Sequence, residues 1–157
     1  MTTDIDGLLG QMTLAEKLGQ LNLLNPGGQV LTGTTGNTGI HKKLLDGAVG
    51  MMFGTSSLKS RRRIQTICCE ETRLKIPMLF ASDVIHGYRT ALPLPLALSC
   101  SWNLELIRRA ARVSAIEARA DGIDLTFAPM VDVSRDPRWG RVAESCGESA
   151  TLAAMIA

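Results

Sequence analysis

The chain has 157 residues, of which 45% are hydrophobic and 20% are charged, an ordinary composition for a globular chain with one core. Seventeen Lys and Arg residues against fifteen Asp and Glu residues give a net charge of +2, too small a bias to indicate a nucleic-acid or membrane-surface partner. No stretch reaches the roughly 18 apolar residues that span a bilayer. The N-terminus also lacks the basic and then apolar pattern of a signal peptide. As written, the chain is therefore expected to be cytoplasmic, with no membrane partner.

The four cysteines show no spacing typical of a metal site. Cys68 and Cys69 are adjacent, no C-x-x-C pair occurs, and both histidines lie far from any cysteine pair. This pattern argues against a zinc site and predicts no bound metal. Cys68 and Cys69 are expected to pack as small hydrophobic side chains in a reduced protein. The basic run at 61–63 is expected to be a solvated helix face.

The first 47 residues are predicted to form a lead-in of helices and loops. Thr13 and Glu16 have the spacing of a capping box, and leucines follow at helical intervals, which predicts a helix over 13–24. Residues 25–39, rich in Gly, Thr and Asn, predict a surface loop before a short helix near 41–45. No phosphate-binding G-x-x-x-x-G-K-[ST] motif is present.

Residues 48–157 alternate between apolar strand patterns and helical patterns. Short apolar runs at 48–53, 78–81 and 123–128 predict buried strands. Helices are predicted after a cap at Ser56 or Ser57, over 104–120 between Asn103 and Gly122, and again from near Ser149. Strands that alternate with helices pair in parallel through right-handed crossovers, so the sequence predicts an α/β architecture.

Two α/β designs are compatible with this order. A Rossmann fold would place G-x-G-x-x-G after the first strand, and the motif is absent. A barrel requires polar loops after its strands, and residues 82–92 and 131–147 provide them. We therefore predict a partial (β/α)8 TIM-type barrel. Because a complete barrel needs about 250 residues, residues 48–157 would supply about three of its eight βα units.

The two polar loops carry the residues suited to binding a sugar. Both follow predicted strands, at the face of a barrel where active sites lie. A carboxylate such as that of Asp83 can accept hydrogen bonds from vicinal hydroxyls, and a guanidinium can donate two bonds to neighbouring oxygens. Purely structural readings also apply: Asp83 as a helix cap, His86 as a packed loop residue, and Asp136 as the brace of a turn with Arg138 or Arg141.

Hydrolysis through a serine or zinc centre has no support in the sequence. No nucleophile elbow and no H-E-x-x-H motif occurs. A pair of carboxylates is then the remaining acid–base option, as in retaining glycosidases, where the two groups lie about 5 to 5.5 Å apart. Spacing alone selects no pair among the acidic residues in or directly after the two loops, which are Asp83, Asp132, Asp136, Glu144 and Glu148.

Four stretches resemble glycoside hydrolase family 3, and most closely its bacterial periplasmic β-glucosidase branch. They run from Met12 to Leu21, from Arg73 to Pro77, over Asp83-Val-Ile-His-Gly87, and from Ala128 through the Asp-Pro-Arg-Trp-Gly-Arg motif that ends at Arg141. The resemblance runs from the first of these stretches to the last, and so covers nearly the whole chain. The last stretch is long and specific.

The resemblance implies a (β/α)8 barrel followed by an α/β sandwich domain, with this chain as the opening part of the barrel domain. In family terms, Asp83 looks like the aspartate that holds hydroxyls of the terminal sugar in the −1 subsite. Arg141 looks like a second contact to that sugar, and Asp136 and Arg138 would shape its loop. The family's nucleophile and acid/base are expected beyond residue 157, so no catalytic residue is assigned within this chain.

The implied activity is that of a retaining exo-β-glucosidase acting on β-glucosides or β-linked oligosaccharides, without metal or organic cofactor. The isolated chain is expected to be inactive and to need the missing C-terminal portion as a partner. The relatives imply a periplasmic location. Where the family reads Phe-Gly-Glu-Asp, this chain reads Cys146-Gly-Glu-Ser149, which weakens any transfer of a role to Glu148. A non-catalytic sugar-binding chain and a β-N-acetylglucosaminidase of the same family remain alternatives.

Overall fold

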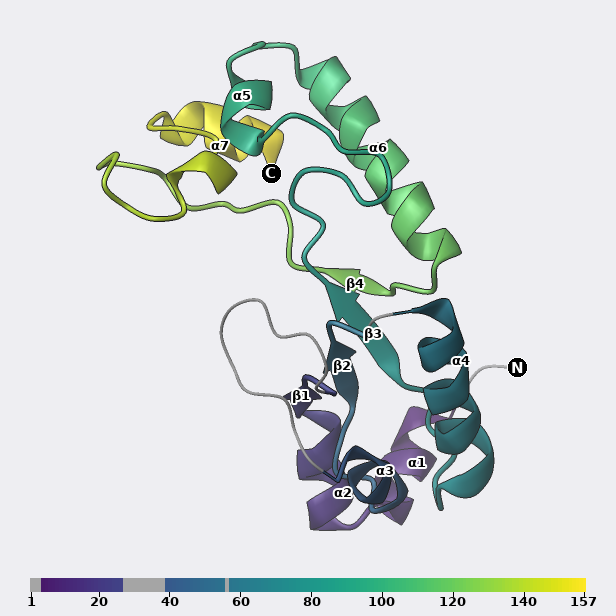
Figure 1. Cartoon of the computed structure of the whole chain (residues 1–157). Coiled ribbons are helices and arrows are strands. Elements are labelled where there is room, and N and C mark those ends of the chain that lie inside the picture. Colours follow the sequence, from purple (N-terminus) through teal and green to yellow (C-terminus); the bar gives the residue numbers. More distant parts are fainter. Residues whose placement is uncertain (1–3, 27–38, 56) are drawn as a thin grey trace. The chain divides into compact units, whose positions relative to one another are not determined.

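A computed structural model describes residues 4–26, 39–55 and 57–157. The chain divides into two compact units, Met1–Ala81 and Ser82–Ala157, whose elements are labelled in Figure 1. Most of the loop predicted over 25–39, and one of the two serines considered as a helix cap, Ser56, lie outside the described residues. Among the residues that are described, no helix has the length and apolarity to cross a membrane.

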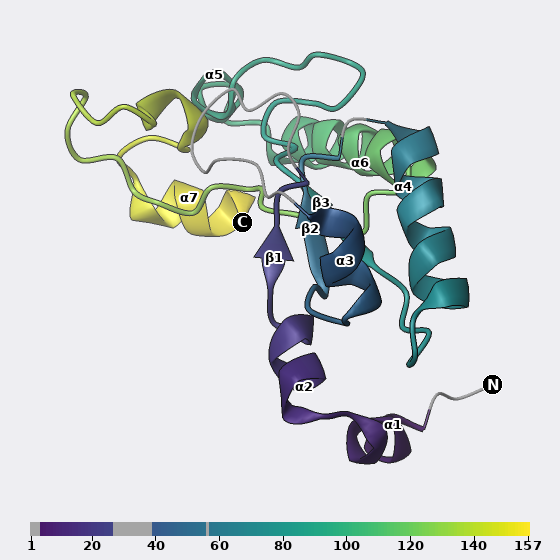
Figure 2. The same cartoon turned by 60° about the horizontal axis from the view of Figure 1, so that its bottom comes forward.

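The first unit is built on a parallel sheet. Strand β2 (Met51–Phe53) pairs in parallel with β1 (Leu23–Leu24) and with β3 (Leu79–Ser82), and Figures 1 and 2 show it between them. The helical segments α3 (Ile40–Leu45), α4 (Leu58–Thr66) and the π-helix η1 (Ile67–Glu71) occur in the connections between these strands. Parallel strands joined through helices are the arrangement of an α/β fold, which confirms the predicted class.

Strand β1 was not predicted. The chain begins with α1 (Ile5–Gln11) and α2 (Leu14–Gln20), and the expected continuation of the second helix to residue 24 is wrong. The carbonyl of Asn22 instead accepts hydrogen bonds from the N–H groups of Gly50 and Met51, which draws the following two residues into the sheet. The lead-in over 1–47 therefore supplies a strand as well as helices, in addition to the three strands expected later in the chain.

The basic run at 61–63 is only partly solvated. Arg62 and Arg63 are exposed, but Arg61 is buried and its Nη1 donates to the carbonyl of Thr55 at 2.8 Å. The expectation of a fully solvated face is therefore wrong for Arg61. The buried guanidinium hydrogen-bonds the main chain that leaves β2, and this contact offsets the cost of removing the charge from water.

The second unit carries the longest helix, α6 (Leu104–Ala120), over the predicted range. The side chain of Asn103 accepts from the N–H of Leu106 at 3.0 Å, and Gly122 takes a φ of +78° just after the helix, as expected of an N-cap and a C-terminal glycine. The unit also contains α5 (Pro95–Ser99), β4 (Leu125–Thr126), the 3₁₀-helix η2 (Val142–Glu144) and α7 (Ala150–Ile156), which is capped by Ser149.

Candidate functional site

The first polar loop begins at Asp83, directly after β3, and closes on itself. The N–H of Leu92 donates to the carbonyl of His86 at 2.8 Å, and Gly87 forms an antiparallel bridge with Ala91. Gly87 has a φ of +98°, and a Cβ at this position would lie 2.0 Å from the carbonyl oxygen of Thr90. Only glycine meets both conditions without strain. The loop is therefore a compact turn that presents the exposed carboxylate of Asp83 at the end of a strand.

The same loop is bound by two acidic side chains, Glu117 of α6 and Asp121 directly after that helix. One carboxylate oxygen of Glu117 accepts from the main-chain N–H groups of Arg89 and Thr90, both at 2.9 Å, and the other accepts from the hydroxyl of Thr90 at 2.6 Å. The guanidinium of Arg89 donates to both oxygens of Asp121. The bonds from Thr90 lower the pKa of Glu117, and the bonds to Asp121 raise the pKa of Arg89. These contacts could not be predicted from the sequence, because no local pattern pairs residues that are 27 to 32 positions apart.

The second polar loop contains a local ion pair between Asp136 and Arg138. The carboxylate of Asp136 accepts from the main-chain N–H of Arg138 at 2.9 Å and from its Nε and Nη2, the latter at 2.5 Å. These bonds lower the pKa of Asp136, the side-chain bond being the larger cause. The side chain of Arg138 is 89% exposed. The pair closes the turn around Pro137, which is the geometry of a loop brace.

Arg141 lies immediately before η2 and is paired with Glu144. Its Nη2 donates to Glu144 Oε2 at 2.6 Å, and its Nε lies 3.2 Å from both carboxylate oxygens. Of the two arginines considered as partners of Asp136, Arg138 and Arg141, the structure selects Arg138. The hydrogen bond to Glu144 is the main cause of a raised pKa for Arg141, and the charges of Asp83 and Asp132 raise it further.

Electrostatic interactions connect the two polar loops through the guanidinium of Arg141. Arg141 is within electrostatic range of Asp83 and Asp132, and the charge of His86 contributes to the lowered pKa of Glu144, after the larger effects of Arg141. We call these five residues the Arg141 cluster. It combines carboxylate acceptors with guanidinium donors at the end of a strand, which suits recognition of sugar hydroxyls.

The remaining acidic residue of the second loop, Glu148, is exposed. No three His, Cys, Asp or Glu side chains within 4–26, 39–55 and 57–157 form a group that could hold a metal ion.

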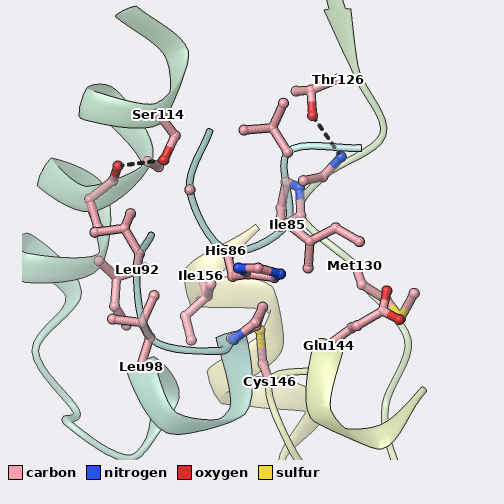
Figure 3. Close-up of a pocket in the computed structure, with 18 of the residues that line it drawn as sticks. Ile85, His86, Leu92, Leu98, Ser114, Thr126, Met130, Glu144, Cys146 and Ile156 are labelled. Atoms are coloured by element: carbon pink, nitrogen blue, oxygen red, sulfur yellow. Dashed lines mark hydrogen bonds between the residues drawn. The ribbon is translucent and has the colours of Figure 1, made fainter. Parts of the chain in front are cut away.

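A cavity of about 260 Å³ adjoins the cluster within the second unit. His86, Glu144 and Cys146 line one part of it, as Figure 3 shows, and the rest is mainly apolar, with residues of α6 such as Ile107. His86 is exposed rather than packed, which corrects the structural reading of this histidine. Cys146 is buried, and burial raises the pKa of its thiol. An apolar wall offers few partners for the hydroxyl groups of a sugar, so the polar Arg141 cluster is the better candidate site.

Known proteins resemble this chain in sequence and in fold. The sequence profile of the glycosyl hydrolase family 3 N terminal domain matches residues 13–157. The periplasmic beta-glucosidase of Salmonella typhimurium is 44% identical over 152 residues, which cover 97% of this chain and 19% of that protein. The crystal structure of a beta-glucosidase from Listeria innocua in complex with isofagomine superposes with a TM-score of 0.82 at 43% identity, covering 98% of this chain and 22% of the other.

A second Listeria innocua structure, in complex with glucose, gives a TM-score of 0.82 at 44% identity and covers 96% of this chain and 22% of the other. The chain therefore spans about a fifth of the length of these relatives. The similarity confirms the predicted fold, in which parallel strands and helices form part of a (β/α)8-type barrel. This chain belongs to glycosyl hydrolase family 3, whose N-terminal domain it matches over nearly its entire length.

Proposed function

We propose that this chain is the N-terminal part of a retaining exo-β-glucosidase that releases terminal β-D-glucosyl residues. In this proposal the chain supplies sugar contacts of the −1 subsite and is inactive by itself. The Arg141 cluster carries the proposal, because it combines Asp83 and Arg141 from two separate loops in one electrostatic group. The 44% identity to a periplasmic beta-glucosidase supports the same reaction class.

Each of the polar residues has a distinct part in the proposed subsite. The exposed carboxylate of Asp83 would accept hydrogen bonds from two vicinal hydroxyls of the terminal sugar. Arg141 would donate to a neighbouring sugar oxygen, and charge-assisted bonds of this kind are stronger than neutral ones. Asp136 and Arg138 would keep the second loop in shape through their ion pair. The relative that was crystallised with glucose supports a glucosyl group as the sugar.

The nucleophile and the acid/base are proposed to come from outside residues 1–157. A general acid must hold a proton near the working pH, which requires a raised carboxyl pKa. Glu144 and Asp136 have the opposite property, because hydrogen bonds from Arg141 and Arg138 lower their pKa values. Both carboxylates are also held in ion pairs with arginines. This environment supports roles in binding and loop shape for Asp136 and Glu144 rather than a role as general acid.

Hydrolysis of an aryl β-D-glucoside tests the proposal. We expect no turnover by the purified chain alone. We expect turnover from a hybrid in which the full 157-residue chain replaces the matched segment of the Salmonella typhimurium enzyme. In that hybrid Asp83→Ala and Arg141→Ala should each lower kcat/KM by about 10- to 100-fold, since each removes a charge-assisted hydrogen bond. Asp46→Ala, which removes an exposed carboxylate paired with Lys42 in the first unit, should leave kcat/KM within about twofold.

The opposite outcomes would point to other functions. Turnover by the isolated chain that Asp83→Ala abolishes would place the catalytic groups within residues 1–157. A hybrid that folds, as judged by circular dichroism and a cooperative thermal transition, but hydrolyses no glucoside would favour a non-catalytic sugar-binding chain. Faster hydrolysis of an aryl N-acetyl-β-D-glucosaminide than of the glucoside would indicate the other branch of the family.

A further inference from the structure

Glu144 binds Arg141 along a single edge of the guanidinium. The contacts involve Nε, at 3.2 Å from both carboxylate oxygens, and Nη2, at 2.6 Å from Oε2. Among the hydrogen bonds formed within the described part of the chain, none has Nη1 of Arg141 as its donor. A planar guanidinium that is held through one edge has a defined plane and keeps its remaining N–H groups for another oxygen.

The backbone reinforces this arrangement. The main-chain N–H of Glu144 donates to the carbonyl of Arg141 at 3.0 Å, so the 3₁₀ turn is closed by the main chain and by the side chains together. The side chain of Glu144 is only 26% exposed, while that of Arg141 is 55% exposed. Arg108 and Glu105 on α6 form an ion pair of the same length and sequence separation, but with side chains that are 75% and 66% exposed. The partly buried pair is therefore the more constrained of the two.

Several carboxylates of the cluster attract the guanidinium of Arg141, so its orientation depends on which of them binds it. The carboxylates of Asp83 and Asp132 also act on Arg141 through space. The attraction of Asp83 favours rotation of the guanidinium towards that carboxylate. Such a rotation would weaken Arg141 as a sugar donor and Asp83 as a sugar acceptor. Glu144 opposes this rotation because its carboxylate accepts hydrogen bonds from two of the guanidinium nitrogens. Such a two-pronged contact favours one orientation of the guanidinium.

We propose that Glu144 is a positioning residue, which holds Arg141 by its Nε and Nη2 edge so that Arg141 and Asp83 act separately as sugar donor and sugar acceptor. This inference rests on the proposed function of the two residues in the −1 subsite. Glu144 itself touches no reacting atom in this scheme. Its removal should therefore affect catalysis only through Arg141 and Asp83.

The test uses the hybrid enzyme and a matched pair of substitutions. Glu144→Gln keeps the size of the side chain and removes the charge, and Glu105→Gln makes the same change in the exposed pair on α6. We expect Glu144→Gln to lower kcat/KM for the aryl β-D-glucoside about tenfold, chiefly through a higher KM, and Glu105→Gln to leave it within about twofold. A purely structural role would lower the midpoint of thermal unfolding and leave the kinetics of the folded enzyme unchanged.

A double-mutant cycle with Asp83→Ala separates positioning from general damage. If Arg141 turns towards Asp83 in the Glu144→Gln variant, Asp83 no longer binds the sugar there. The loss of kcat/KM caused by Asp83→Ala should then be at least about threefold smaller in that variant than in the unsubstituted hybrid. Should Glu144→Gln fail to fold, the cycle is run with Glu144→Asp, which keeps the charge but shortens the side chain and so weakens the fork. The same non-additive loss is expected.

Two further results bear on different claims. Equal kinetics for Glu144→Gln and Glu105→Gln, or full additivity in the cycle, would overturn the positioning role while leaving the proposed function intact. A folded hybrid with no activity, or with activity that neither Asp83→Ala nor Arg141→Ala changes, would overturn the proposed function itself, and the positioning role with it.

Discussion

Glu16 and Arg73, 57 positions apart in the sequence, form a two-pronged ion pair within the first unit. Arg73 Nε donates to Glu16 Oε1 at 2.9 Å, and Nη2 donates to Oε2 at 2.6 Å. The same carboxylate accepts from the N–H and the hydroxyl of Thr13 at 2.8 Å, which completes the capping box of α2. One carboxylate thus caps the start of α2 and binds this helix to the segment that precedes β3.

This pair predicts a specific loss of stability in acid. The bonds from Arg73, and then those from Thr13, lower the pKa of Glu16 from an ordinary 4.5 to about 2. Because the folded-state pKa lies below the unfolded value, the stabilisation is complete above pH 4.5 and disappears as the pH falls towards about 2. Glu16→Gln should therefore lower the urea midpoint near neutral pH and flatten its decline in acid. The exposed Glu71, changed to Gln, serves as the control, and parallel acid profiles for both variants would contradict the assignment.

Met52 is expected to be the most sensitive apolar position of the sheet. It lies on the central strand β2, opposite Phe80 of β3, and its side chain is 0% exposed. Met52→Ala should reduce the free energy of unfolding by about 2 to 5 kcal/mol, because the substitution leaves a cavity that the sheet cannot close. Met155→Ala, at a position that is 59% exposed, should cost no more than about 0.5 kcal/mol. Urea denaturation of both variants measures the difference, and similar losses would argue against a packed core around β2.

Asn103 should contribute to stability through the first turn of α6. Its side chain accepts the N–H of Leu106 at 3.0 Å, and loss of an N-cap typically costs about 1 kcal/mol. Asn103→Ala should lower the free energy of unfolding by about that amount, whereas Asn103→Asp should retain it. Thermal denaturation of the two variants distinguishes the cap from simple side-chain loss. Equal destabilisation by both would show that the oxygen is not the group that matters.

Glu117 should control the exchange of the two amides that it binds. It accepts from the N–H groups of Arg89 and Thr90, both at 2.9 Å, and loss of such a bond is expected to speed local opening about tenfold. Hydrogen exchange of Glu117→Ala should show this increase at both amides, and Glu105→Ala, also on α6, should not. Unchanged protection at Thr90 would mean that the loop closes without its contact to the helix.

Local signals in the sequence were sufficient to predict the ends of several helices. A cap side chain and the N–H that it binds are three positions apart, so Thr13, Asn103 and Ser149 could be identified without knowledge of the fold. The strand β1 could not be identified in this way. The leucines that follow α2 satisfy a helical pattern as well as a strand pattern, and the hydrogen bonds of Asn22 to Gly50 and Met51 decide between them.

In the candidate site, too, local sequence signals could be used and contacts between distant residues could not. Asp83 could be placed because a polar residue after a buried strand lies at the end of the sheet. The partner of Arg141 could not, because residues 141–144 carry no helical pattern, and only the 3₁₀ turn brings Glu144 under the guanidinium. The contacts of Glu117 with the first loop depend on how α6 packs against that loop, and no motif in the sequence predicts this packing.

The compact turn that follows Asp83 has a consequence for the energetics of ligand binding. Gly87 closes its tip, the N–H of Leu92 closes its base, and Glu117 attaches it to α6. A sugar bound in the proposed subsite would contact a segment that has already lost its conformational entropy during folding. Little further ordering is then needed when the complex forms, so more of each new contact is retained as affinity.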